Sequence, residues 1–192
     1  MTQTWVMGSS TVVAALAHDL APVEADVTIV ATAAHFSGAT QAAVALSNEL
    51  SKTEWRCEAL MVGDRSAATD PYFARRVSEC DLVVALDGSP LHARSVWRHS
   101  PLGEALTAHP RVVGIGAVGS VFGDPMIDPR GGAPTSGLGR FSHVVVMAEA
   151  SSDEEQRTRS LLGAEPLLVI GTTGAVVIDH QWRVLTGEVR EL

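Results

Sequence analysis

The sequence has few cysteines, no concentration of positive charge and no long hydrophobic run. Its two cysteines, Cys57 and Cys80, are too few and too isolated for a disulfide framework or a zinc site, and are typical of reduced thiols. A net charge of −8 without any basic cluster argues against a surface for nucleic acid or anionic membranes. No apolar run reaches the ~18 residues that span a bilayer, and the N-terminus lacks the pattern of a secretory signal. These absences predict a soluble, cytoplasmic protein.

The chain also lacks internal repeats, low-complexity tracts and any evident linker. Its 192 residues suit one domain, and a hydrophobic content of 46% is ample for a sizeable core. We therefore expect residues 1–192 to form a single domain.

Apolar, β-branched segments alternate with helical ones along most of the chain. This alternation predicts an α/β fold with a mostly parallel, doubly wound sheet and helices on both faces. The ligand of such a sheet lies beyond the carboxyl ends of its strands. The expected strands are 4–7, 27–31, 56–62, 81–86 and 111–115, and the expected helices are 12–20, 40–50, 70–79, 91–97 and 101–108.

The distal part of the chain has a different pattern. Strands are expected at 143–147, 167–170 and 175–178, with one charged helix at 153–162 and a last strand at 182–185. The pattern predicts a β-rich C-terminal end added to the open sheet.

Two blocks of the sequence are distinctive: GSPLHARSVWRHSPLGEAL (88–106) and DPMIDPRGGAPTSGLGR (124–140). On these residues the chain resembles the dipeptidase E and cyanophycinase family of serine peptidases. The resemblance extends over roughly residues 27–185. It implies the class I glutamine amidotransferase-like fold, a flavodoxin-like three-layer sandwich.

The resemblance also implies where catalytic residues should lie. The family carries its nucleophilic serine in a turn that falls here on Gly116, and its histidine falls within Ala148-Glu149-Ala150. Its oxyanion turn falls on Gly88-Ser89 and its acid partner on Asp124, and both of these are present. Because removing a triad member costs such an enzyme several orders of magnitude in rate, the sequence argues against a working serine peptidase.

Other residues near this site are candidates for chemistry or for ligand binding. Asp124, Glu149 and His92 are the candidates for acid–base chemistry, since paired carboxylates or a loop imidazole can move protons. Gly88, Ser89, Gly116, Ala117 and His35 are the candidates for ligand binding, and Ser120 is a weaker candidate nucleophile. Each polar candidate also has an ordinary structural explanation. The histidines can pack against a helix, Glu149 can point to water, and Ser120 can lie one helical turn beyond the turn at Gly116.

The predicted function is a small-molecule pocket at the former peptidase site, without serine-peptidase activity. The expected ligand is amino-acid-derived, carrying a carbonyl or carboxylate and an amine or hydroxyl. Two alternatives stay open: a repurposed enzyme using acid–base chemistry on a metabolite, and an inactive partner of an active paralogue. A third, weaker alternative is a flavin- or nucleotide-binding protein built on Gly8-Ser9-Ser10-Thr11, although this turn lacks the lysine of a P-loop and the glycines of a dinucleotide fingerprint. No metal and no cofactor is expected. A homodimer is left open.

Overall fold

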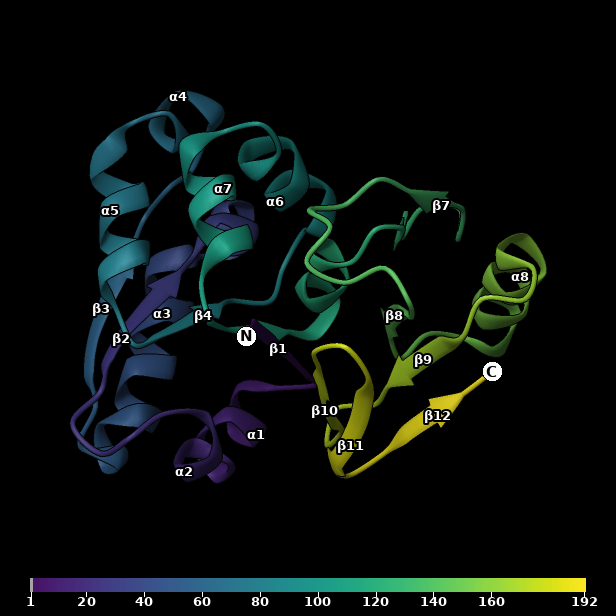
Figure 1. Ribbon diagram of the computed structural model, residues 1–192, viewed down its shortest axis with the longest axis horizontal. Helices are drawn as coiled ribbons and strands as arrows, with labels where there is room; N and C mark the ends of the chain where they lie inside the picture. The colour runs from purple at the N-terminus through teal and green to yellow at the C-terminus, as the bar shows by residue number, and fades with distance from the viewer. Residues whose placement is uncertain (1) are drawn as a thin grey trace.

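A computed structural model describes residues 2–192 and contains a main sheet in the order β11-β10-β1-β5-β4-β2-β3 (Figure 1). The five strands from β1 to β3 in this order are parallel, whereas β10 and β11 are antiparallel. The bounds are β1 (Gln3–Met7), β2 (Asp26–Val30), β3 (Arg56–Leu60), β4 (Leu82–Ala85), β5 (Arg111–Ile115), β10 (Ala175–Ile178) and β11 (Trp182–Thr186). The expected mostly parallel sheet is confirmed.

The sheet separates two hydrophobic cores because neighbouring strand residues point to opposite faces. In β1, Val6 belongs to one core, while Trp5 and Met7 belong to the other. In β4, Val83 and Val84 divide in the same way. Strands buried on both faces explain the continuous β-branched runs of the sequence.

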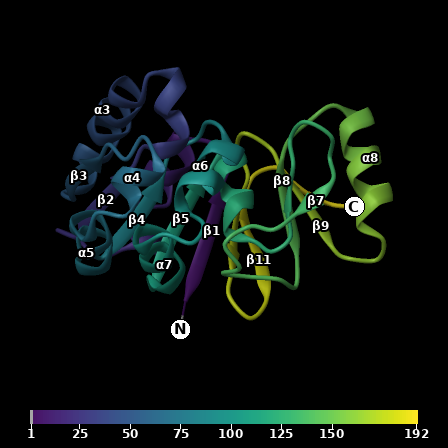
Figure 2. The same ribbon diagram turned by 90° about the horizontal axis from the view of Figure 1, so that it is seen from above.

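Helices cover each face of the sheet (Figures 1 and 2). The core that contains Trp5 is closed by residues of α1 (Ser10–Ala15), α2 (Ala17–Leu20) and α3 (Ala39–Leu50). The opposite core is closed by residues of α4 (Arg65–Ala68), α5 (Pro71–Glu79), α6 (Pro90–Trp97), α7 (Pro101–Ala108) and the 3₁₀ helix η3 (Gly116–Phe122). Two further 3₁₀ helices are η1 (Thr32–Ser37) and η2 (Ser51–Thr53).

A second, smaller sheet lies beside the first and has the order β12-β9-β8. Its strands are β8 (Val145–Ala148), β9 (Leu167–Ile170) and β12 (Val189–Glu191), and α8 (Ser152–Leu162) packs on it through a third apolar cluster. A bidentate ion pair joins this helix to β12: Arg190 donates to both carboxylate oxygens of Glu155, at 2.9 and 2.6 Å. The β-rich C-terminal end is therefore present.

The long loop after η3 is tied to the main sheet by one arginine. Arg140 donates hydrogen bonds to the carbonyl oxygens of Gln3, Leu106, Thr107 and His109, at 2.6 to 2.9 Å. Burial of this guanidinium lowers its pKa to about 10. The same loop contains β6 (Met126–Ile127) and β7 (Pro134–Thr135), which pair with each other.

Several boundaries differ from expectation. The helix expected at 12–20 is two helices separated at Leu16, whose backbone (φ −102°, ψ 14°) is not helical. The strand at 182–185 is not the last one, because β12 follows it. Helix α4, which was not expected, begins at Asp64, whose carboxylate accepts the Ala67 N–H. Within residues 2–192, none of the helices has the length and apolar character that a bilayer span requires.

Candidate functional site

The site is built where β4 and β5 end, side by side, at the carboxyl edge of the sheet. The register pairs Ala85 with Gly114, so the segments that leave both strands start at the same level. Gly116 follows β5 with φ +58°, a left-handed conformation that favours glycine. A Cβ placed there would lie only 2.3 Å from Cγ of Asp87. The position therefore disfavours a side chain through its backbone, and a side chain would also displace the Asp87 carboxylate.

Asp87 fills the space that a side chain on residue 116 would need. Its Oδ1 accepts the Gly88 N–H at 2.8 Å and the Ala117 N–H at 3.0 Å. One carboxylate oxygen thus joins the ends of the two central strands.

The Gly88-Ser89 turn is held tightly against the segment that follows β2. Gly88 has φ +152°, and a Cβ on it would lie 2.3 Å from the carbonyl oxygen of Ala33. That oxygen accepts the Ser89 N–H at 2.9 Å. The Ser89 hydroxyl accepts the His92 N–H at 3.2 Å and so caps α6. Ser89 therefore has a structural task in addition to its predicted one in ligand binding.

The two candidate histidines lie together, with parallel rings. His35 and His92 have ring centroids 5.5 Å apart, and Phe36 packs edge-on against both. Nε2 of His92 lies 3.0 Å from the carbonyl oxygen of Gly63. This contact and the stacking fix the imidazole of His92 in place.

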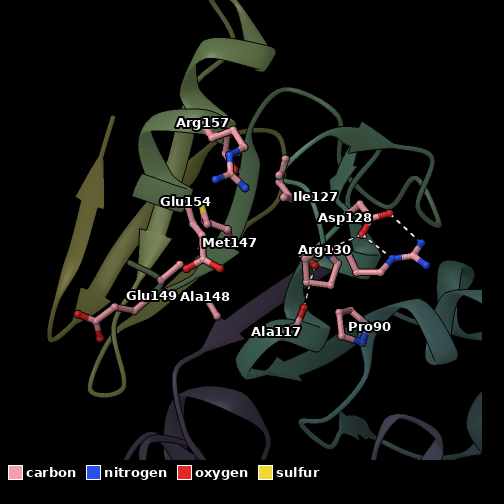
Figure 3. Close-up of a pocket in the computed structure, with 15 residues that line it drawn as sticks. Pro90, Ala117, Ile127, Asp128, Arg130, Met147, Ala148, Glu149, Glu154 and Arg157 are labelled. Carbon is pink, nitrogen blue, oxygen red and sulfur yellow. Dashed lines mark hydrogen bonds and ion pairs between the residues drawn. The ribbon is translucent and has the colours of Figure 1, made fainter. Parts of the chain in front are cut away.

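Next to the Asp87 contact the molecule has a cavity of about 260 Å³, shown in Figure 3. One wall comes from η3 and the loop at 127–132, and the other from the end of β8 and the first turns of α8. Its lining comprises Pro90, Ala117, Ser120, Ile127, Asp128, Pro129, Arg130, Gly132, Met147, Ala148, Glu149, Ala150, Glu154, Arg157 and Thr158.

Most polar groups of this cavity already have partners. Arg130 pairs with Asp128 at 3.0 Å, and this contact lowers the pKa of the Asp128 carboxyl. Glu154 belongs to the capping box of α8, where the Ser151 hydroxyl and N–H lower the pKa of its carboxyl. The hydroxyl of Ser120 donates to the carbonyl oxygen of Ala117 at 2.8 Å. Among residues 2–192, the Arg157 guanidinium makes no ion pair within 4.0 Å.

Thr158 has the least satisfied polar group of the cavity wall. Within the part of the chain that is described, its hydroxyl is buried and has no hydrogen-bond partner. A Cβ on Gly132 would lie 2.6 Å from it, so the glycine allows the loop to approach α8 closely.

The two acidic candidates, Glu149 and Asp124, lie in different depressions. Glu149 borders the cavity but, as Figure 3 shows, points its carboxylate away from the opposite wall. Asp124 lines a different depression, with Trp97 and Arg98, and its carboxylate accepts a long hydrogen bond, 3.4 Å, from the Gly137 N–H. The structure thus brings Gly88, Gly116 and Ala117 together around Asp87 and places Asp124 at another surface. Glu149 and Asp124 therefore line two different depressions.

Sequence reasoning missed Asp87, Arg157 and Thr158. Aspartate before glycine is a common turn pair, so Asp87 gave no signal of its contact with a residue 30 positions away. Arg157 and Thr158 lie on a helix whose many charged residues predict only a solvated face. Among residues 2–192 there is no group of three or more His, Cys, Asp or Glu side chains that could hold a metal ion.

Comparison with known proteins gives a likeness of structure only. No protein-family model and no curated protein sequence matches the chain. The crystal structure of a peptidase from an acI-B1 Actinobacterium superimposes with a TM-score of 0.76 and 16% identity, covering 100% of this chain and 94% of that one. The crystal structure of a putative peptidase E protein from Listeria monocytogenes EGD-e superimposes with a TM-score of 0.67 and 13% identity. The match covers 100% of this chain and 98% of that one. The fold is therefore that of peptidase E-like proteins, as the sequence resemblance implied.

Proposed function

We propose that this chain is a peptidase E-like protein that has no serine-peptidase activity and binds a small amino-acid-derived molecule in the cavity beside Ala117. One observation carries the first half of the proposal. The Asp87 carboxylate occupies the space that a nucleophile on residue 116 would need, within 2.5 Å of the position of its Cβ. A serine hydroxyl cannot share that space.

Ser120 does not replace the missing nucleophile. Its side chain is buried, and its hydroxyl donates its proton to the carbonyl oxygen of Ala117. A nucleophilic serine needs a base that takes this proton, and a carbonyl oxygen is not one. Neither histidine of the stacked pair is hydrogen-bonded to it.

The cavity itself supports the second half. Apolar walls from Ile127 and Met147 surround a small number of polar groups, which is the usual composition of a small-molecule site. Arg157 supplies a guanidinium that suits a ligand carboxylate. The Oε1 atom of Glu154 takes no part in the capping box and suits an ammonium group. The N–H groups of Gly88 and Ala117, expected to receive the ligand, are taken by Asp87.

Two measurements test the proposal. Aspartyl dipeptides should survive prolonged incubation, and a serine-directed fluorophosphonate should leave the protein unlabelled. Cleavage that is lost in the Ser120→Ala variant would contradict the proposal.

The binding half is tested by thermal shift with a panel of free and N-acetylated amino acids. Any compound that stabilises the protein should lose about tenfold or more in affinity in Arg157→Gln, since a charged hydrogen bond is removed. Arg183→Gln removes an exposed arginine of β11 instead and should bind as the unaltered protein does. Equal loss in both variants, or none in either, would place the ligand elsewhere.

A further inference from the structure

The contact of Asp87 with two backbone N–H groups has a consequence beyond filling space. The donors come from two different segments, Gly88 after β4 and Ala117 after β5, and both point at one oxygen. Converging backbone N–H groups of this kind attract anions, because they present fixed positive dipole ends. The group found there is an anion, the carboxylate of Asp87.

The two donors are positioned by the sheet and not by Asp87. β4 and β5 are hydrogen-bonded neighbours up to the pair Ala85–Gly114. The Gly88 turn is also held by the Ser89 N–H, which donates to Ala33. If the carboxylate moves away, the N–H groups therefore remain aimed at the same point.

The space at this point is also independent of Asp87. It exists because residue 116 has no side chain and turns with φ +58°. Room for a carboxylate and two donors directed into it are the requirements of an anion site.

Asp87 is held in this site by few contacts. Its side chain is exposed, and among residues 2–192 no hydrogen bond other than those from Gly88 and Ala117 reaches its carboxylate. It is therefore a removable occupant on a rigid site.

We infer that the N–H groups of Gly88 and Ala117 form a carboxylate-binding site that Asp87 occupies as an internal ligand. As long as Asp87 lies there, the site rejects external carboxylates, both by occupancy and by like charge. Asp87 is thus a specificity-determining residue, which directs the carboxylate of any cavity ligand away from Ala117. The inference does not depend on what the neighbouring cavity binds.

The test uses acetate as the probe and the backbone amide signals of Gly88 and Ala117 in ¹H–¹⁵N correlation spectra. In Asp87→Ala these two signals should move on titration with acetate, with an affinity at least about tenfold higher than in the unaltered protein. Asp87→Asn keeps an oxygen acceptor of the same shape, so its amides should respond no more than those of the unaltered protein. Asp19→Ala removes an exposed carboxylate of α2 and controls for the change in net charge.

The outcomes separate clearly. Acetate binding of equal strength in the unaltered protein and Asp87→Ala would overturn occupancy by Asp87. No response of either amide in a folded Asp87→Ala would overturn the anion site. If that variant fails to fold, hydrogen exchange of the unaltered protein decides. The Ala117 amide should then be protected at least about tenfold more than in a free peptide, and exchange at the free-peptide rate would refute the contact.

Discussion

Replacing Gly116 by alanine should destabilise the protein through two separable effects. The left-handed backbone costs a residue with a Cβ about 1–2 kcal/mol. The new methyl group would lie 2.3 Å from Cγ of Asp87, so the carboxylate must leave its two N–H partners. Losing two hydrogen bonds at an exposed carboxylate adds about 1–2 kcal/mol, because water replaces part of their strength. We expect a total of about 2–4 kcal/mol.

The two effects can be measured apart in a double-mutant cycle. In an Asp87→Ala background the methyl group meets no carboxylate, so Gly116→Ala should cost only the backbone term. The coupling free energy between the two positions should therefore be about 1–2 kcal/mol. Urea unfolding followed by tryptophan fluorescence gives each of the four free energies.

A matched control isolates the backbone term. Gly139 also has a positive φ, +74°, but a Cβ on it would make only an ordinary contact, 3.8 Å, with Asp124. Gly139→Ala should cost about 1–2 kcal/mol in either background. Equal costs of Gly116→Ala with and without Asp87 would refute the steric reasoning and, with it, the argument that Asp87 excludes a nucleophile.

Three further predictions concern stability. Thr158→Val removes the buried hydroxyl without a partner, so it should be neutral or stabilising by up to about 1 kcal/mol in urea unfolding, and a clear loss would reveal a hidden partner. Glu155→Gln should cost about 1–2 kcal/mol at pH 7, because the Arg190 contact lowers the pKa of this carboxyl. That contribution is present above the carboxyl's unfolded pKa of about 4.5 and is lost as the pH falls through the lowered folded value, so the two unfolding curves should converge in acid. Arg140→Met should cost at least about 3 kcal/mol by the same assay, because it leaves four partly buried carbonyl oxygens without this donor, and a loss below 1 kcal/mol would contradict this role.

The central strands were predictable because their residues are buried on both faces. A continuous run such as 27–30 can satisfy two cores only as a strand, and the structure places it inside the sheet, between β4 and the edge strand β3. Helix starts were readable for a similar local reason: Ser89 and Asp70 each cap a helix that has proline at its first position.

Elements stabilised by distant partners were not predictable in the same way. β12 is short and mostly exposed, so it has no hydrophobic pattern. It forms because β9 offers a free edge and because Arg190 finds Glu155, 35 residues away. The interruption at Leu16 likewise depends on packing and leaves no glycine or proline in the sequence.

The same distinction applies to the candidate site. Gly88, Gly116 and Ala117 were selected by position in the resemblance, and the parallel strands bring them together. The resemblance implied a site role for Asp124 as well, but Asp124 lines another depression, and Arg140 holds its loop against β1. A one-dimensional alignment fixes the order of residues along a loop and not the surface at which the loop ends.

The positions of Gly116 and Asp87 are coupled by the space that they share. A side chain on residue 116 and a carboxylate between Gly88 and Ala117 need the same space, so only one of them can be present. Without a side chain on residue 116 and without the Asp87 carboxylate, the N–H groups of Gly88 and Ala117 would have no acceptor at this position. The Asp87 carboxylate, at the end of the neighbouring strand, accepts hydrogen bonds from both donors. Holding it there costs the conformational entropy of one exposed side chain. The pairing of β4 with β5 ends at Ala85 and Gly114, before Asp87 and Gly116, so the strand register does not depend on which of the two groups is present.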